Sequence, residues 1–117
     1  MRFYCKVTGT FDAAHSIKGY EGKCGQLHGH TWKVTVYVEE NAEIVCENGY
    51  DVDLSQLKAD LREVLEEMDH RDLNYLFSKP TAENIARRVF RALYRKYNIF
   101  KVEVEETPGS GVIFTND

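Results

Sequence analysis

Two stretches of the chain alternate between core-type and surface-type residues, and this pattern limits the folds that the chain can adopt. In the first stretch, residues 2–13, one parity holds Phe3, Cys5, Val7, Gly9, Phe11 and Ala13. In the second stretch, residues 28–39, one parity holds His28, His30, Trp32, Val34, Val36 and Val38. A period of two places each set on one face of a β-strand. Both stretches are therefore predicted to be strands with one buried face.

The middle of the chain changes to a helical period. Asp53, with Gln56 three residues later, is typical of a helix N-terminus. The apolar residues of this predicted helix recur at spacings of three and four: Leu54, Leu57, Leu61, Val64, Leu65 and Met68. A second helix is predicted from Thr81, just after Pro80, to about Tyr97. Residues 40–52, between the second strand and the first helix, are predicted to be a loop or an extended excursion around Asn48-Gly49.

Two further strands are predicted near the end of the chain. Residues 100–107 and 112–114 flank the turn-forming segment Pro108-Gly109-Ser110-Gly111. The element order is then β-β-α-α-β-β, which predicts a four-stranded antiparallel sheet with two helices on one face. No repeat or linker-like segment divides the chain, so residues 1–117 are predicted to form one α+β domain.

The composition narrows the classes of function. The net charge of −4 argues against non-specific binding to nucleic acid, which depends on cationic side chains. An odd number of cysteines, three, argues against a disulfide framework and favours a reducing compartment. The N-terminus lacks the apolar core of a signal peptide, and no apolar run approaches the roughly 18 residues that span a bilayer. We expect a cytoplasmic protein with no membrane segment.

Three of the four histidines fall within residues 15–30, and this window predicts a metal site. His28 and His30 lie two residues apart, on the same face of the second predicted strand. His15 can join them if the two strands pair as a hairpin. Three imidazoles with one open position are typical of a catalytic zinc site. The alternative is that these histidines are polar strand ends near solvent.

Cys24, in the loop before His28, has three interpretations. It could be a fourth zinc ligand that closes a Cys-His₃ site. It could instead be a free thiolate, activated by nearby positive charge from the metal, Lys23 or a protonated histidine. It could also be a buried residue with no chemical role.

Three further positions carry groups that could take part in chemistry. Asp69 next to His70 could fix the tautomer of a general base, although a histidine at a helix C-terminus also suits the helix dipole. Glu106 has inward parity, so it could bind a donor-rich heterocycle or pair with a buried basic side chain. Thr81 and Glu83 are explained as a helix cap and a first-turn acid.

Five motifs, in order along nearly the whole chain, resemble the 6-pyruvoyltetrahydropterin synthase family. They are Phe11-Asp12-Ala13-Ala14-His15, Cys24-x-x-x-His28-Gly29-His30, Asp69-His70-x-x-Leu73-Asn74, Pro80-Thr81-x-Glu83-Asn84 and Glu106-Thr107. The three residues between Cys24 and His28, together with the short chain, resemble the 6-carboxy-5,6,7,8-tetrahydropterin synthase branch. Animal pyruvoyl enzymes usually carry a longer gap there.

The resemblance implies the tunnelling (T) fold, in which subunits assemble a barrel as a trimer and two trimers stack into a hexamer. Active sites would then lie between subunits. It implies that His15, His28 and His30 hold zinc, and that Cys24 is the catalytic cysteine.

For the other motif residues, the resemblance implies that His70, held by Asp69, comes from a neighbouring subunit and acts with the cysteine. Glu106 would anchor the pterin ring through its amino and ring nitrogens. Thr81 and Glu83 would border the pterin pocket.

The implied reaction converts 7,8-dihydroneopterin triphosphate to 6-carboxytetrahydropterin, with release of acetaldehyde and triphosphate, as a step toward queuosine and other 7-deazapurines. Two related activities could use the same groups: formation of 6-pyruvoyltetrahydropterin, and aldolase cleavage of dihydroneopterin. A hypothesis from another class is a non-catalytic oligomerisation module stabilised by zinc, with Cys24 as the fourth ligand.

Overall fold

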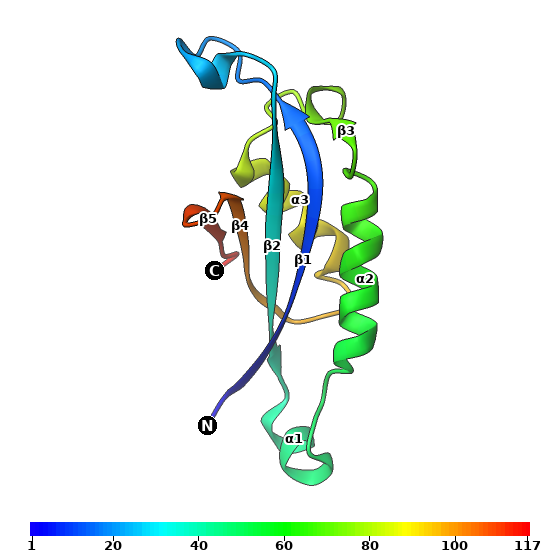
Figure 1. Ribbon diagram of the computed structural model, residues 1–117. Coiled ribbons are helices and arrows are strands. Elements are labelled where there is room, and N and C mark those ends of the chain that lie inside the picture. The colour runs from blue at the N-terminus through cyan, green and yellow to red at the C-terminus, as the bar shows by residue number, and fades with distance from the viewer.

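The computed structural model, which describes residues 1–117, is an α+β fold built on one long β-hairpin (Figure 1). Strand β1 (Phe3–His15) pairs antiparallel with β2 (His28–Glu40) along its whole length. The molecule measures 54 × 24 × 24 Å, with the hairpin loop of residues 16–27 at one end. The two long predicted strands are confirmed, with ends that differ by at most two residues.

The sheet has five strands in the order β3-β1-β2-β4-β5, so the prediction of four strands is wrong. Strand β4 (Ile99–Thr107) pairs antiparallel with β2, and β5 (Ser110–Phe114) pairs antiparallel with β4. The additional strand, β3 (Arg71–Asp72), pairs parallel with Ala13 and Ala14 of β1. The sheet is therefore mixed rather than wholly antiparallel. Two residues are too few for a side-chain pattern, so the sequence carries no signal for β3.

Helices α2 (Leu54–Glu66) and α3 (Ala82–Leu93) cover one face of the sheet (Figure 1). Helix α2 packs on β1, and α3 packs on β4 and β5. The predicted caps are confirmed: Asp53 accepts hydrogen bonds from the first turn of α2, and Thr81 accepts one from Asn84 N–H at 3.3 Å. Helix α3 ends at Leu93, before the predicted end near Tyr97.

A third helix, α1 (Ala42–Asn48), lies where the sequence predicts a loop, so the count of two helices is also wrong. The Asn41 side chain accepts hydrogen bonds from Glu43 N–H and Ile44 N–H, and Gly49 ends the helix with a φ of 89°. These two caps stabilise a helix of only seven residues, which is too short to display an amphipathic period. Two short 3₁₀ helices, η1 (Lys23–Gly25) and η2 (Leu73–Tyr75), complete the fold.

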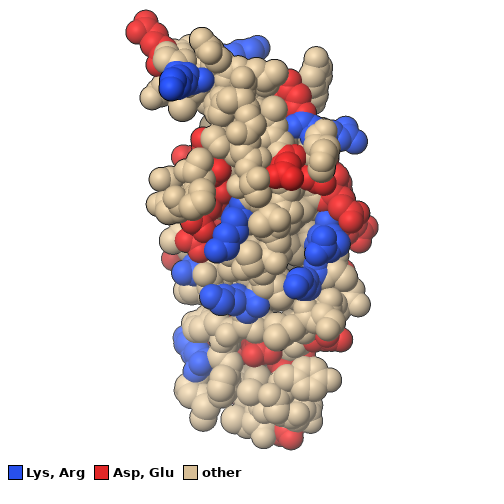
Figure 2. Space-filling model, viewed as in Figure 1, with Lys and Arg blue, Asp and Glu red and all other residues tan.

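The core lies between the sheet and helices α2 and α3. Its largest fully buried side chains include Trp32, Phe11, Leu57, Leu61 and Ile85. From the predicted inward faces of the first two strands, the core contains Val7, Phe11, Ala13, Trp32, Val34, Val36 and Val38. On the face that shows β1, β2 and α2, lysine and arginine side chains are interspersed with acidic ones (Figure 2). No helix is both long enough and apolar enough to cross a membrane.

Strand β5 approaches β4 closely at Gly111, and this packing gives a test of the fold. A Cβ at Gly111 would overlap the carbonyl oxygen of Val104 and lie 2.7 Å from Glu105 Cα. We predict that Gly111→Ala lowers the free energy of unfolding by about 1–3 kcal/mol, because backbone atoms must shift to admit the methyl group. Denaturant unfolding followed by the fluorescence of Trp32, the only tryptophan, measures this change.

The matched control is Gly29→Ala. A Cβ at Gly29 would meet no atom nearer than the Ala13 carbonyl oxygen at 4.0 Å, so a change within about 0.5 kcal/mol is expected. Equal stability of the two variants would contradict the close approach of β5 to β4.

Candidate metal centre

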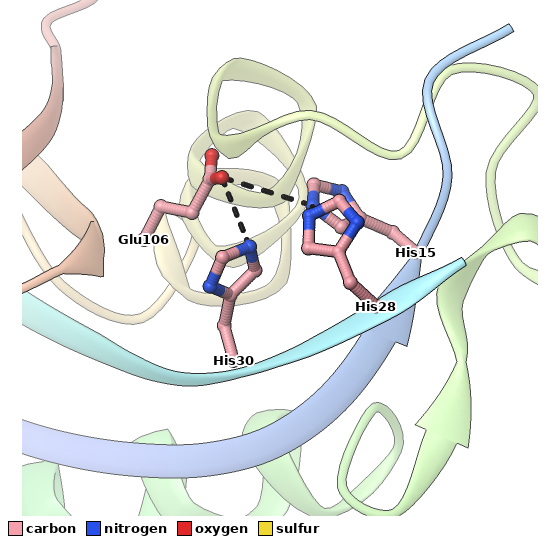
Figure 3. Close-up of side chains that lie close together, drawn as sticks. All are labelled: His15, His28, His30 and Glu106. Carbon is pink, nitrogen blue, oxygen red and sulfur yellow. Dashed lines mark hydrogen bonds and ion pairs between the residues drawn. The ribbon is translucent and has the colours of Figure 1, made fainter. Parts of the chain in front are cut away.

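The three predicted histidine ligands converge at the loop end of the hairpin, next to residues 16–27 (Figure 3). His15 ends β1 directly opposite His28, which begins β2, and His30 follows two residues later on the same face. The centroid of the His15 ring lies 4.6 Å from the centroid of the His28 ring and 5.2 Å from that of the His30 ring. Trp32 lies beneath, with its ring 5.0 Å from His15 and 5.2 Å from His30. The buried face of β2 therefore continues directly into the histidine cluster.

Backbone carbonyls fix the tautomers of two rings. His15 Nδ1 is 2.7 Å from the carbonyl oxygen of Pro80, and His28 Nδ1 is 2.6 Å from that of Gln26. A carbonyl oxygen only accepts hydrogen bonds, so each Nδ1 carries a proton and donates it. In the neutral rings each Nε2 then carries a lone pair, and these two Nε2 atoms face each other at 3.0 Å. Such a contact requires a cation between them.

His30 and Glu106 add two more acceptor atoms to the same space. His30 Nε2 is buried without a hydrogen-bond partner. A Glu106 carboxylate oxygen lies only 3.0 Å away, but outside the direction that a hydrogen bond requires. Burial lowers the pKa of His30, and Glu106 only partly opposes this effect. A neutral His30 with a free lone pair is suited to bind a metal.

The donor set fits a metal ion better than a proton. One proton can bridge two of these atoms, whereas the cluster offers three imidazole nitrogens and one carboxylate oxygen within 4.8 Å of one another. Zinc binds imidazole nitrogens at about 2.0–2.1 Å and carboxylate oxygens at about 2.0–2.2 Å, so one ion can reach all four after small side-chain adjustments. His15, His28, His30 and Glu106 therefore form a site that could hold a metal.

Cys24 is not part of this cluster. It lies on η1 in the hairpin loop, where its side chain is exposed. The loop is held by a hydrogen bond from Ile17 N–H to the Cys24 carbonyl at 3.0 Å. It is also tight, because a Cβ at Gly25 would overlap the Tyr20 carbonyl oxygen. The fourth group in the cluster is thus Glu106 rather than Cys24, which leaves the thiol free for other chemistry.

Asp69 and His70 form a second group, beside Asp12 on β1. His70 Nδ1 is 2.9 Å from a carboxylate oxygen of Asp69. Asp12 binds both residues through its backbone: its N–H donates to Asp69 at 2.9 Å, and its carbonyl accepts from His70 N–H at 2.6 Å. His70 has a φ of 60°, an uncommon conformation for a residue with a side chain and one often found at functional sites.

The pair changes the titration of both members. The Asp12 backbone N–H, followed by His70, lowers the pKa of Asp69. The hydrogen bond from His70 to Asp69 raises the pKa of His70. The predicted contact between the two side chains is therefore present, and His70 lies four residues beyond the last residue of α2, Glu66, rather than in its final turn.

Thr81 and Glu83 lie at the start of α3. Thr81 caps the helix, and Glu83 is an exposed acid in the first turn. The structure brings neither side chain into the histidine cluster. Their segment does reach it through Pro80, whose carbonyl accepts the His15 hydrogen bond.

The sequence assigned no supporting role to three residues that hold the site. Gln26 and Pro80 act through backbone carbonyls, for which residue type gives no signal. Asn74 holds the segment after His15, since its side chain accepts from Ser16 N–H at 2.8 Å and donates to the Ser16 carbonyl at 3.0 Å. Asn74 is the last residue of one of the five motifs, and this position could have indicated that it supports the site.

Comparison with known proteins gives a match between residues 4–117 and the family model described as 6-pyruvoyl tetrahydropterin synthase. A relative from Archaeoglobus fulgidus, provisionally named a 6-carboxy-5,6,7,8-tetrahydropterin synthase, is 41% identical over 86% of this chain and 84% of its own length. A Pyrococcus furiosus relative, named dihydroneopterin monophosphate aldolase, is 46% identical over 66% of this chain and 62% of its own length.

Solved structures agree with the sequence matches. The 6-pyruvoyl tetrahydropterin synthase of Caenorhabditis elegans superposes with a TM-score of 0.84 at 25% identity, covering 100% of this chain and 97% of the other. The two chains thus share the same overall fold.

The Asp69–His70 contact predicts a specific pH dependence. Because Asp69 raises the pKa of His70, the imidazole stays protonated to a higher pH than the ordinary value of 6.5. Asp69→Asn removes the negative charge, so the titration midpoint of His70 should fall toward that value. NMR titration of the ring resonances measures it. Asp72→Asn, a nearby change that leaves the pair intact, should not move the midpoint; an unchanged midpoint in Asp69→Asn would contradict the assignment.

Proposed function

Because the chain belongs to the 6-pyruvoyl tetrahydropterin synthase family, we propose that it is a zinc-dependent 6-carboxy-5,6,7,8-tetrahydropterin synthase. Its substrate is then 7,8-dihydroneopterin triphosphate, and its products are 6-carboxytetrahydropterin, acetaldehyde and triphosphate. The reaction is a carbon–carbon lyase step toward queuosine and other 7-deazapurines. The observation that carries this proposal is the cluster of His15, His28 and His30, with their lone pairs turned to one point.

The metal would be held by the three histidines. Zinc bound there supplies a Lewis acid that polarises the hydroxyl groups of the substrate side chain. The chain fixes the ligands in advance, because Pro80 and Gln26 hold the rings of His15 and His28 in the tautomer that a metal needs.

The remaining residues bind the substrate and move protons. The Cys24 thiolate removes a carbon-bound proton from the substrate side chain. His70, whose pKa is raised by its hydrogen bond to Asp69, favours the thiolate and returns a proton. Glu106 accepts hydrogen bonds from the amino group and a ring nitrogen of the pterin, and Thr81 and Glu83 border its pocket.

Assembly completes the site in this proposal. Cys24 and His70 are both exposed in the single chain, while proton transfer of this kind needs a site shielded from water. A trimer-based assembly, a hexamer of two stacked trimers, would bring His70 of one subunit to Cys24 of another and bury both.

A second candidate function is an aldolase reaction on a dihydroneopterin phosphate. It is favoured by the Pyrococcus furiosus relative, whose name states that activity. The metal cluster, Cys24 and Glu106 would serve this reaction equally, so the two candidates differ in the bond that breaks and in the aldehyde that leaves.

Product analysis separates these candidates. Zinc-loaded protein incubated with 7,8-dihydroneopterin triphosphate should release acetaldehyde and 6-carboxytetrahydropterin, both detected by mass spectrometry. Glycolaldehyde would instead identify the aldolase. No turnover of either the triphosphate or the monophosphate, with metal bound, would contradict an enzymatic role and favour a zinc-stabilised oligomerisation module.

The same assay includes Cys24→Ser. It should lower kcat by about 10²–10⁴-fold, the usual contribution of a positioned acid–base group, without loss of bound metal. Cys46→Ser is the matched control, because Cys46 is also exposed but lies on α1, outside the metal cluster.

A further inference from the structure

Glu106 is the member of the cluster that the proposed function assigns to the pterin, yet it lies among the metal-binding atoms (Figure 3). A carboxylate oxygen is 3.0 Å from His30 Nε2 and 3.8 Å from His15 Nε2. These two rings are the only groups able to carry positive charge within 4.0 Å of the carboxylate. The neighbouring Glu105, by contrast, pairs with Lys33 at 3.6 Å and accepts a hydrogen bond from Gly109 N–H at 2.9 Å. Glu106 therefore has no lysine or arginine partner.

A β-bulge gives Glu106 this position. The register between β4 and β5 shifts between Glu105 and Thr107, so Glu106 is not part of the regular pairing. A bulge redirects a side chain relative to the alternation of the strand. The backbone thus holds Glu106 beside His30, while the torsions of its long side chain leave the carboxylate free to turn.

The electrostatics of this arrangement require a cation. A carboxylate carries negative charge, and the Nε2 atoms of His15 and His28 present lone pairs to the same space. These groups repel one another at short range unless positive charge lies between them. A metal ion held by the three histidines supplies that charge, and the carboxylate then completes a set of four ligands of the kind zinc accepts.

We propose that Glu106 is an exchangeable fourth ligand: it binds the metal in the pterin-free protein and leaves it for the donor groups of a bound pterin. The second half of this statement rests on the proposed function. Because a catalytic zinc site needs one open position, the exchange opens that position only when a pterin is in place.

A cavity next to the cluster offers room for the exchange. It has a volume of about 520 Å³, and its wall includes His30, Glu106, Thr31 and Thr107. Volumes of about 300–1,000 Å³ are typical of pockets for small molecules. The side chain of Glu106 is 33% exposed, so its carboxylate can turn from His30 toward a ligand in this cavity without movement of β4.

Azide binding to the cobalt-loaded full-length protein tests the first half. Azide enters an open metal position and changes the visible spectrum of Co²⁺, so the readout is independent of turnover. If Glu106 fills the position at least nine-tenths of the time, Glu106→Gln should bind azide at least about tenfold more tightly than the wild type. Glu105→Gln removes a carboxylate from the adjacent position of β4 and should match the wild type.

The second half is tested with unsubstituted pterin, which has the donor edge but no side chain that could reach the metal. Pterin at saturation, checked by its own fluorescence, should make the wild type bind azide as tightly as Glu106→Gln does. It should leave the azide affinity of Glu106→Gln unchanged.

Equal azide affinity of wild type and Glu106→Gln overturns the fourth-ligand role. Failure of pterin to bind, or to raise the azide affinity of the wild type, overturns the exchange. If Glu106→Gln does not fold, Glu106→Asp replaces it in the test. Its shorter carboxylate should reach the metal less well, so Glu106→Asp should bind azide more tightly than the wild type. An azide affinity equal to that of the wild type overturns the fourth-ligand role. Product analysis of the zinc-loaded wild type is a separate measurement, so the proposed function and this inference can fail independently.

Discussion

Two hydrogen bonds from imidazole rings to backbone carbonyls determine the chemistry at the end of the hairpin. They join His15 Nδ1 to Pro80 and His28 Nδ1 to Gln26. Because each Nδ1 donates its proton to a carbonyl, Nε2 of each neutral ring carries a lone pair. The two Nε2 atoms lie 3.0 Å apart. An arrangement that is unfavourable without a cation becomes a preorganised site when a metal binds.

The fold supplies the conditions for these two bonds. The antiparallel register places His15 opposite His28, and the rings of His15 and His30 pack against Trp32 at the end of the core. Pro80 comes from the segment that begins α3, so the helical layer reaches the metal site through one carbonyl. On the other side of β1, the backbone N–H and carbonyl of Asp12 hold Asp69 and His70 through hydrogen bonds. In both places backbone groups orient the side chains of the candidate site.

Strand parity predicted much of this from the sequence. The alternation that put Phe11, Trp32 and Val34 in the core also put the three histidines on one face, because side-chain direction depends only on the period of the strand. Glu106 was predicted to point inward, and it does reach the cluster. The sequence did not reveal that it approaches the metal-binding nitrogens, because the bulge that places it depends on the pairing of β4 with β5.

The features missed from the sequence are those that backbone atoms make. Strand β3 consists of two residues, and helix α1 depends on the caps Asn41 and Gly49 rather than on an apolar stripe. The carbonyl partners of the histidines likewise have no residue signature. The roles proposed for Cys24 and His70 rest on the resemblance to the family, because the single chain does not bring the two side chains together.

X-ray absorption at the zinc edge of the substrate-free protein tests the central claim most directly, because it reports the atoms bound to the metal. Our account predicts three imidazole nitrogens and one carboxylate oxygen at about 2.0–2.2 Å. A sulfur shell at about 2.3 Å would show that Cys24 is a ligand and would contradict the account, as would failure of the protein to bind zinc.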